Sequence, residues 1–449
     1  MRHFHCKVID PTIAKGYNNN LEVVHDQFVL VRRTVPLPIP DERVIVMING
    51  GRLLQHLQDL SRIGCNEATG GINRFSFTSV EKQAIELVTI YMEQAGMKVT
   101  VDAVGNLIGT YGEGDETIML GSHIDTVPEG GKYDGALGVL AAIEVVNRLY
   151  EQQILPSKKI QVVAFKDEEG TRFGFGLLGS SAMAGLLTEE QLQHTDEAGI
   201  SIEEAMKEFQ LSPYPLVNAQ RNDIKAYLEM HIEQGKVLEN EDLPVGVVTG
   251  IAAPVWLEIT VTGVSEHAGA TPMPIRQDAL TAASEMILAI ERLLNDTTDA
   301  VATVGKLTVS PNGTNVIPGK VTFSIDLRDI DEQKVRSLET KILQQLQQIA
   351  DRRNVTLASK ILQRIKPAKA DEKLQQQLAI SIEKQGIRPY TLISGAGHDA
   401  MNMAEIAPIG MLFVRSKDGI SHNPLEFSSD EDIIIATTIF YDSVVELSK

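Results

Sequence analysis

Four short segments of the sequence place possible metal ligands directly after apolar, strand-like runs. The imidazole and carboxylate side chains in these segments are His123, Asp125, Asp134, Glu168, Glu169, His231 and His422. Open α/β sheets bind their ligands just beyond the carboxyl ends of their strands. The shared placement therefore predicts that these side chains meet at one edge of a sheet.

Each of these residues has a plainer interpretation when it is taken alone. A single histidine such as His123 is more often structural, and adjacent carboxylates such as Glu168 and Glu169 are often solvated loop charges. Two neighbouring carboxylates repel each other, however, unless a cation lies between them. Three histidines with two carboxylates supply enough nitrogen and oxygen ligands for two zinc-like ions, with one carboxylate shared.

Such a pair of ions, about 3.5 to 4 Å apart, can hold a shared water, lower its pKa and polarise a substrate carbonyl. One carboxylate of the Glu168 and Glu169 pair can bind metal while its neighbour takes a proton from the water as general base. The constellation therefore predicts hydrolysis. Zinc suits these ligands, and manganese, cobalt or nickel are alternatives because such sites accept several metals according to supply.

The elements that must position these residues alternate along the chain. Apolar runs at 117–120, 160–165 and 227–230 predict strands, and the patterns at 135–150 and near 201–209 predict helices. This alternation predicts an α/β sheet.

Around Pro254 the pattern changes to strand, helix, two strands, helix and strand. The predicted elements lie at 255–262, 278–294, 302–309, 320–327, 332–351 and 356–363. This order is that of the ferredoxin-like split unit. The strand predicted at 410–414 then rejoins the first sheet. We expect an N-terminal extension at 1–46, catalytic parts at 47–250 and 367–449, and an inserted domain at 251–366.

Composition limits the possible partners. The 449 residues carry a formal net charge of -19, which disfavours nucleic acid and anionic membrane surfaces. Only two cysteines are present, so a disulfide framework is excluded and a reducing compartment fits. The first thirty residues hold acidic side chains and lack a continuous apolar run. We therefore expect a cytoplasmic protein.

At the ligand segments the sequence resembles the aminoacylase and carboxypeptidase superfamily of dinuclear zinc hydrolases, and within it the amidase/hydantoinase/carbamoylase branch. The resemblance runs from about residue 47 to the C-terminus and includes GSHIDTVPEGGKYDGALG, FKDEEGTRFG, LEMHIEQG and KDGISHNP. It implies two ligand sets that share one aspartate: His123, Asp134 and His231, and Asp134, Glu169 and His422. It also implies that Glu168 is the general base and that Asp125 orients His123.

The resemblance continues through EHAGATPMPIRQDAL, PNGTNVIPG, DLRDID and SGAGHDAM. It implies that Gln234 and His267 meet a ureido group, and that Asn315 and Arg328 hold a substrate carboxylate. Plainer alternatives are a salt bridge from Arg328 to Asp326 and a loop-fixing role for His267. His398 is expected near the ligands or at a helix start rather than as a ligand.

The resemblance also implies a homodimer. His267 would lie in the active site of the partner subunit, and the inserted domain would form the interface. The fold class is thus a mixed-sheet α/β dinuclear metal hydrolase domain with an inserted ferredoxin-like α+β dimerisation or lid domain.

The favoured activity is hydrolysis of an N-carbamoyl-L-amino acid to the amino acid, carbon dioxide and ammonia. Allantoate, which also carries a carboxylate and ureido groups, is the alternative substrate. A dipeptidase or aminoacylase is more distant, because many peptidases of the superfamily have an acidic residue where this chain has His231. A binding protein that has lost catalysis is disfavoured, because every implied ligand and Glu168 are present.

Overall fold

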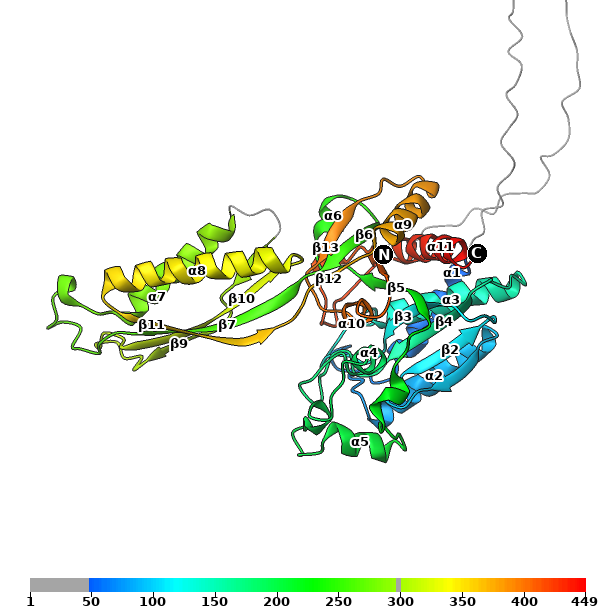
Figure 1. Ribbon diagram of the computed structural model, residues 1–449, viewed down its shortest axis with the longest axis horizontal. Helices are drawn as coiled ribbons and strands as arrows, with labels where there is room; N and C mark the ends of the chain where they lie inside the picture. Colours follow the sequence, from blue (N-terminus) through cyan, green and yellow to red (C-terminus); the bar gives the residue numbers. More distant parts are fainter. Residues whose placement is uncertain (1–47, 296–299) are drawn as a thin grey trace, which may run out of the picture. The chain divides into compact units, whose positions relative to one another are not determined.

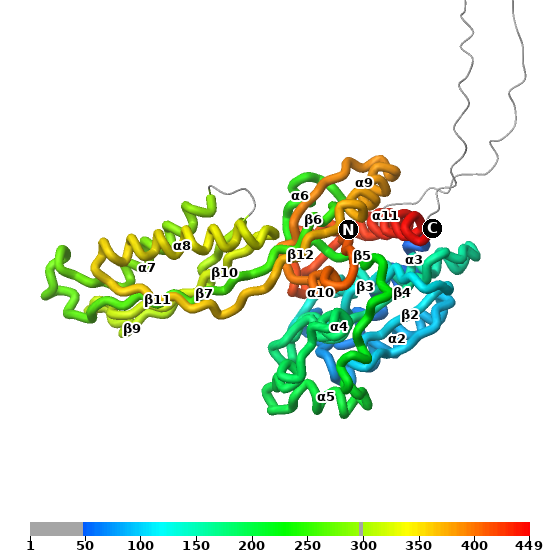
Figure 2. Tube along the Cα trace, in the orientation of Figure 1, coloured from blue at the N-terminus to red at the C-terminus, as the bar shows by residue number. Residues whose placement is uncertain are grey.

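The computed structural model describes residues 48–295 and 300–449. Residues 47–449 form one unit, and the extension predicted at 1–46 lies outside the described residues. The strands of the described part form two separate sheets (Figures 1 and 2). The predicted metal ligands all come from the part of the chain that builds the larger sheet.

Within the described residues, nine strands form the larger sheet, in the order β1-β2-β4-β3-β5-β14-β6-β12, with β13 paired to β6. Their bounds are Lys98–Val101 (β1), Leu107–Tyr111 (β2), Thr117–His123 (β3), Lys159–Phe165 (β4), Ile224–Ile232 (β5), Val245–Ile251 (β6), Ala368–Lys369 (β12), Thr391–Ser394 (β13) and Ile409–Val414 (β14). The four neighbours β4, β3, β5 and β14 are parallel. The pairs β1 with β2, β2 with β4, β14 with β6 and β6 with β12 are antiparallel. The predicted mixed α/β sheet is confirmed.

The parallel strands are buried because helices cover both faces of the sheet. Every residue of β3 and of β14 is buried, which is why these strands read as continuous apolar runs. Helix α3, apolar on almost all sides, packs against β3, β4 and β5, while α10 contacts β5 and β14 (Figure 1). The helices associated with this sheet are α1 (Gly50–Ser61), α2 (Ser79–Gln94), α3 (Ala136–Glu151), α4 (Leu178–Met183), α5 (Ile202–Glu208), α6 (Val237–Asn240), α9 (Glu372–Lys384), α10 (Ala400–Met403) and α11 (Asp430–Leu447).

The second sheet takes all its strands from residues 253–364. They are β7 (Ala253–Thr262), β8 (Val301–Thr303), β9 (Leu307–Ser310), β10 (Lys320–Asp329) and β11 (Thr356–Arg364), with helices α7 (Ala279–Asn295) and α8 (Glu332–Arg353). The order β11-β7-β10-β8, with β9 also on β10, is antiparallel throughout. This is the ferredoxin-like arrangement that the element order predicts.

One predicted strand differs from the structure. The run 302–309 forms two short strands, β8 and β9, rather than one. Their registers against β10 differ by one residue, so an extra residue is accommodated between them. Ser324 of β10 accepts a side-chain hydrogen bond from the Lys306 backbone at this break, which compensates for the interrupted ladder. No helix of the described residues is long and apolar enough to cross a bilayer.

Gly121 in β3 offers a test of the sheet. Its φ is +150°, and a Cβ atom there would lie 2.0 Å from the Val163 carbonyl oxygen of β4. We expect Gly121→Ala to lower the free energy of unfolding by about 2–4 kcal/mol, because β3 must move away from β4. Urea unfolding measures the change.

Gly305, in the break between β8 and β9, is the matched control. A Cβ atom there meets nothing within 4 Å, so Gly305→Ala should change the free energy of unfolding by less than about 0.5 kcal/mol. Equal effects of the two substitutions would contradict the packing argument.

Candidate metal centre

The four parallel strands bring the predicted ligands to one edge of the larger sheet. His123 is the last residue of β3, and His231 is the penultimate residue of β5. Glu168 and Glu169 follow the end of β4, and His422 follows β14 after a short loop. Because the strands are parallel, these positions lie at their shared carboxyl end.

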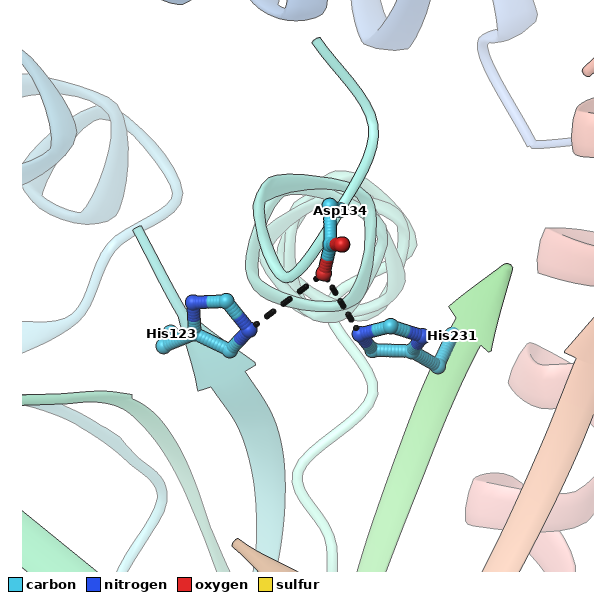
Figure 3. A group of neighbouring side chains, drawn as sticks. All are labelled: His123, Asp134 and His231. Atoms are coloured by element: carbon cyan, nitrogen blue, oxygen red, sulfur yellow. Dashed lines mark ion pairs between the residues drawn. The ribbon is translucent and has the colours of Figure 1, made fainter. Parts of the chain in front are cut away.

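Asp134 lies between His123 and His231, two residues before the first residue of α3 (Figure 3). Its Oδ1 is 3.6 Å from Nε2 of His123 and 3.1 Å from Nε2 of His231. Its Oδ2 is 3.2 Å from Nε2 of His422. One carboxylate therefore faces two imidazoles with one oxygen and a third imidazole with the other.

The paired glutamates complete the cluster. Oε1 of Glu169 is 3.7 Å from Nε2 of His422, and Oε2 of Glu168 is 3.6 Å from Nε2 of His123. Glu168 thus faces His123, and Glu169 faces His422.

Backbone carbonyls orient two of the rings. Nδ1 of His123 is 3.1 Å from the Asp125 carbonyl oxygen, and Nδ1 of His231 is 2.9 Å from the Ile232 carbonyl oxygen. A proton on each Nδ1 can donate to these oxygens and leaves each Nε2 without a proton. Nε2 of His231 also accepts the backbone N–H of Gly135 at 3.3 Å. Both Nε2 atoms face Asp134 (Figure 3).

The residues present fit divalent cations. Zinc bonds of 2.0–2.2 Å to nitrogen and oxygen place the ligands of a tetrahedron about 3.4 Å apart, and the separations given above bracket that value. Among the described residues, two groups of three share Asp134, and the ligand atoms of each lie within 4.8 Å of one another. These groups are His123, Asp134 and His231, and Asp134, Glu169 and His422. Two overlapping groups meet the same limit: His123, Glu168 and Glu169, and Glu229, His231 and His398.

The electrostatics of the cluster also suit a cation. Burial, reinforced by the charge of Asp134, raises the pKa of Glu169 to about 7. Burial raises the pKa of Glu168 well above its usual range. A hydrogen bond to Asp134 raises the pKa of His422 to about 9. Protons held by these groups compete with a cation for the same lone pairs.

The Asp125 side chain makes contacts that the sequence did not reveal. Its Oδ1 accepts the backbone N–H of Glu168 at 3.2 Å, and its Oδ2 accepts that of Glu169 at 3.1 Å. Oδ1 also lies 3.6 Å from Nδ1 of His123. Asp125 therefore connects the His123 segment to the loop that carries both glutamates.

The cluster opens on a cavity of about 220 Å³. Its walls are formed by His123, Asp134, Glu168, Glu169, Leu177, His231, Gln234, Ala396, Gly397, His398 and His422. Nε2 of Gln234 donates to Oδ2 of Asp134 at 2.9 Å. His398 is buried, with Nε2 2.8 Å from Oγ of Ser394 and its ring centroid 4.5 Å from that of His231. Both side chains are thus next to the ligands.

Three predicted substrate residues belong to the second sheet and its loops, and none of them lines this cavity in the described chain. His267 is exposed, and its Nδ1 accepts the backbone N–H groups of Gly269 and Ala270. Asn315 lies beside it, because its carbonyl accepts the N–H of Ala268.

Arg328 makes the salt bridge to Asp326 that the sequence analysis gives as the alternative to carboxylate binding. Its Nε and Nη2 donate to the two carboxylate oxygens of Asp326 at 3.0 and 2.9 Å. Its Nη1 donates to the carbonyl of Gly395, which directly precedes cavity residues Ala396 and Gly397. Arg328 thus reaches the loop at the rim of the cavity while its fork is engaged by Asp326.

Two buried acids near the ligands escaped the sequence analysis. Glu229 precedes His231 by two residues, accepts the Ser122 hydroxyl at 2.8 Å and accepts the Tyr227 hydroxyl at 3.1 Å. Glu426 lies four residues after His422 and accepts the backbone N–H groups of Tyr133 and Asp134. In the sequence, these two residues are marked only by being acidic and close to a predicted ligand. Acidic residues at such positions are too common to predict a role in the site.

Known proteins resemble this chain over most of its length. The sequence pattern of peptidase family M20/M25/M40 matches residues 119–446. The chain is 46% identical over 409 residues to an N-carbamoyl-L-amino acid amidohydrolase of Geobacillus stearothermophilus, covering 90% of this chain and 100% of that protein. It is 36% identical over 414 residues to an allantoate deiminase of Arabidopsis thaliana, covering 84% of this chain and 78% of that protein.

A solved structure is similar over nearly the same length. It is the amidase of the hydantoinase/carbamoylase family from Burkholderia multivorans, with a TM-score of 0.84 and 34% identity. The match covers 89% of this chain and 98% of that one.

Metal binding should depend on pH through His422 and Glu169. Both must lose a proton to act as ligands, and their pKa values are about 9 and about 7. We expect the apparent metal affinity to rise between about pH 6 and pH 9, by about tenfold per pH unit for each proton displaced. Competition with a chelator at several pH values measures it.

His422→Ala should reduce metal content and make the rise above about pH 7 smaller, and His231→Ala should also reduce metal content. His194→Ala, which removes an exposed histidine whose ring is tilted against that of Phe175, is the control and should leave both properties unchanged. Full metal occupancy of His231→Ala and His422→Ala by elemental analysis would contradict the ligand sets.

Proposed function

Because this chain belongs to peptidase family M20/M25/M40 and is a hydrolase of its hydantoinase/carbamoylase branch, we propose that it hydrolyses N-carbamoyl-L-amino acids. The products are the free amino acid, carbon dioxide and ammonia. The relatives named N-carbamoyl-L-amino acid amidohydrolase support this substrate class, at 46% and 39% identity over almost their whole length.

The observation that carries the proposal is the position of Asp134 among three imidazoles, with Glu168 and Glu169 beside them. We propose that His123, Asp134 and His231 hold one divalent ion, and that Asp134, Glu169 and His422 hold a second. Zinc is the proposed metal, and manganese, cobalt or nickel are alternatives for the same ligand types. When bound, these ions would acidify a water molecule and polarise the carbamoyl carbonyl.

Glu168 is the proposed general base. Burial holds its pKa well above the usual range, so the carboxylate has a strong affinity for a proton. Its backbone N–H is held by Asp125, and its side chain lines the cavity. Glu168 would take a proton from the attacking water and return it to the nitrogen that leaves when the C–N bond breaks.

The substrate would be held by groups on both sheets. Gln234 lines the cavity and carries an amide that can meet the ureido group. His267 would donate to the carbonyl oxygen as negative charge develops there. Asn315 and Arg328 would bind the carboxylate. Arg328 would exchange its bonds to Asp326 for bonds to the substrate, because a guanidinium fork suits a carboxylate. The Arg328 contact with the rim loop at Gly395 supports this assignment.

We propose that the protein is a homodimer in which His267 serves the site of the partner subunit. His267 is exposed and does not line the cavity of its own chain. The inserted domain at 251–366 would form the interface, between catalytic parts at 47–250 and 367–449. A small-molecule substrate and a cytoplasmic location complete the proposal, in keeping with the acidic composition and the two cysteines.

Allantoate is the second candidate substrate. The allantoate deiminase of Arabidopsis thaliana is 36% identical to this chain, and allantoate presents the same two chemical groups, a carboxylate and a ureido group. Ammonia release from N-carbamoyl amino acids, allantoate, ureidoglycolate and dipeptides, with zinc or manganese added, would separate the candidates. The highest kcat/KM identifies the substrate class.

Glu168→Gln should lower kcat by about 10²- to 10⁴-fold, because the amide cannot accept the proton of the water. Metal content should stay close to that of the unmodified protein, since both proposed ligand sets remain. Glu86→Gln, at an exposed position of α2, is the control and should leave kcat unchanged. Normal turnover by Glu168→Gln would overturn the assignment of the base.

The dimer proposal predicts complementation. Glu168→Gln and His267→Ala proteins should each be nearly inactive, but one site of a mixed dimer carries both changes and the other carries neither. Random pairing makes half the dimers mixed, so refolding the two together should restore about a quarter of all sites. Absence of recovery, with mixed dimers demonstrated by mass spectrometry, would show that His267 does not act across the interface.

A further inference from the structure

Glu426 connects two ligand segments that lie far apart in the sequence. Its side chain is buried, at 4% exposure. Oε1 accepts the backbone N–H of Tyr133 at 2.9 Å and that of Asp134 at 3.1 Å. Glu426 itself lies in the loop that follows His422. Its carboxylate thus fixes the backbone of the shared aspartate from the segment that supplies another ligand.

The second oxygen of Glu426 extends this connection to the side chain of Asp134. The hydroxyl oxygen of Ser421 lies 2.9 Å from Oε2 of Glu426 and 3.1 Å from Oδ2 of Asp134, so its single proton is shared between the two carboxylates. Ser421 directly precedes His422. A single hydroxyl therefore lies between the two carboxylates, at the Asp134 oxygen that faces His422.

The surrounding backbone leaves space for this carboxylate and for little else. A Cβ atom at Gly131 would lie 2.2 Å from Oε1 of Glu426. The segment from Gly131 to Asp134 therefore passes directly over the Glu426 side chain. A buried carboxylate is costly unless it is hydrogen bonded, and two backbone donors with one hydroxyl supply those bonds.

The plainer interpretation is that Glu426 only stabilises the start of α3. Its carboxylate lies close to the N-terminus of that helix, where negative charge is favourable. That role would act on folding and would not depend on metal. The Ser421 hydroxyl, however, connects Glu426 to the Asp134 oxygen that faces His422, so Glu426 also influences the proposed ligands.

We propose that Glu426 is a positioning residue that holds Asp134 and the His422 loop in the mutual arrangement required to bind metal. It acts through Asp134 and Ser421 and does not itself serve as a ligand. Any effect of Glu426 on catalysis rests on the proposed function. The effect of Glu426 on metal affinity does not depend on which substrate is hydrolysed. Measurement of affinity therefore tests Glu426 even if the substrate assignment fails.

The experiment uses the full chain, stripped of metal by a chelator and titrated with zinc or manganese against a competing indicator. Glu426→Ala should weaken the apparent metal affinity by about 10- to 100-fold, the range typical of groups that orient metal ligands. Ser421→Ala should weaken it by about 2- to 10-fold, as expected for one hydrogen bond. Glu426→Gln should fall between the unmodified protein and Glu426→Ala, because its amide oxygen can still accept the backbone N–H groups.

Asp371→Ala is the matched control. One carboxylate oxygen of Asp371 accepts two backbone N–H groups, those of Lys373 and Leu374, at the start of α9. This change should lower the melting temperature of the metal-free protein without altering metal affinity.

A double-mutant cycle between Glu426→Gln and Ser421→Ala should show non-additive losses of affinity, since both act through one chain of hydrogen bonds. If Glu426→Ala fails to fold, Glu426→Gln and Ser421→Ala carry the test. Unchanged metal affinity in these variants, with only a lower melting temperature as in Asp371→Ala, would overturn the proposal.

Discussion

The carboxylate of Asp134 is buried and has three imidazole rings around it, while Glu168, Glu169 and Glu426 lie close by. Several like charges in such a space raise one another's pKa unless positive charge compensates them. Without a metal, protonated histidines can supply that charge. A bound divalent cation would replace it, because a histidine must be neutral to act as a ligand. The arrangement of the surrounding loops follows from this requirement, because each loop must deliver either a ligand or a donor that keeps a carboxylate ionised.

A parallel sheet brings the ligand-bearing loops together even if each strand end is placed only approximately. The ends of β3, β4, β5 and β14 fix the origins of the four loops, and the buried helix α3 fixes Asp134. Hydrogen bonds between loops provide the remaining accuracy. The side chain of Asp125 holds the backbone of Glu168 and Glu169, and Glu426 holds that of Asp134. The rigid strands therefore determine which residues meet, and the polar contacts determine how they face one another.

The sequence predicted several buried strands but missed β2 and β6, which are also mostly buried. The runs at 117–120, 160–165, 227–230 and 410–414 correspond to fully covered strands, whose apolar residues are continuous. The edge strand β1 was not predicted, because its residues are mostly exposed and carry no such pattern. The break in 302–309 depends on register against β10, which local sequence does not encode. Residue types at strand ends predicted which side chains gather at the site. The contacts of Asp125 and Glu426 depend on how the loops meet in space, so local sequence did not predict them. The roles of individual residues stay predictions.

The double attachment of Asp125 has a consequence for how this site can change over generations. One short side chain is adjacent to the ring of His123 and also holds the backbone of the proposed base and of its neighbouring ligand. A substitution that shifts the His123 segment therefore shifts the proton acceptor in the same direction. The positions of ligand and base therefore change together. New substrate preferences are more readily acquired in the loops of the second sheet, whose described residues make no comparable contact with the metal-ligand cluster.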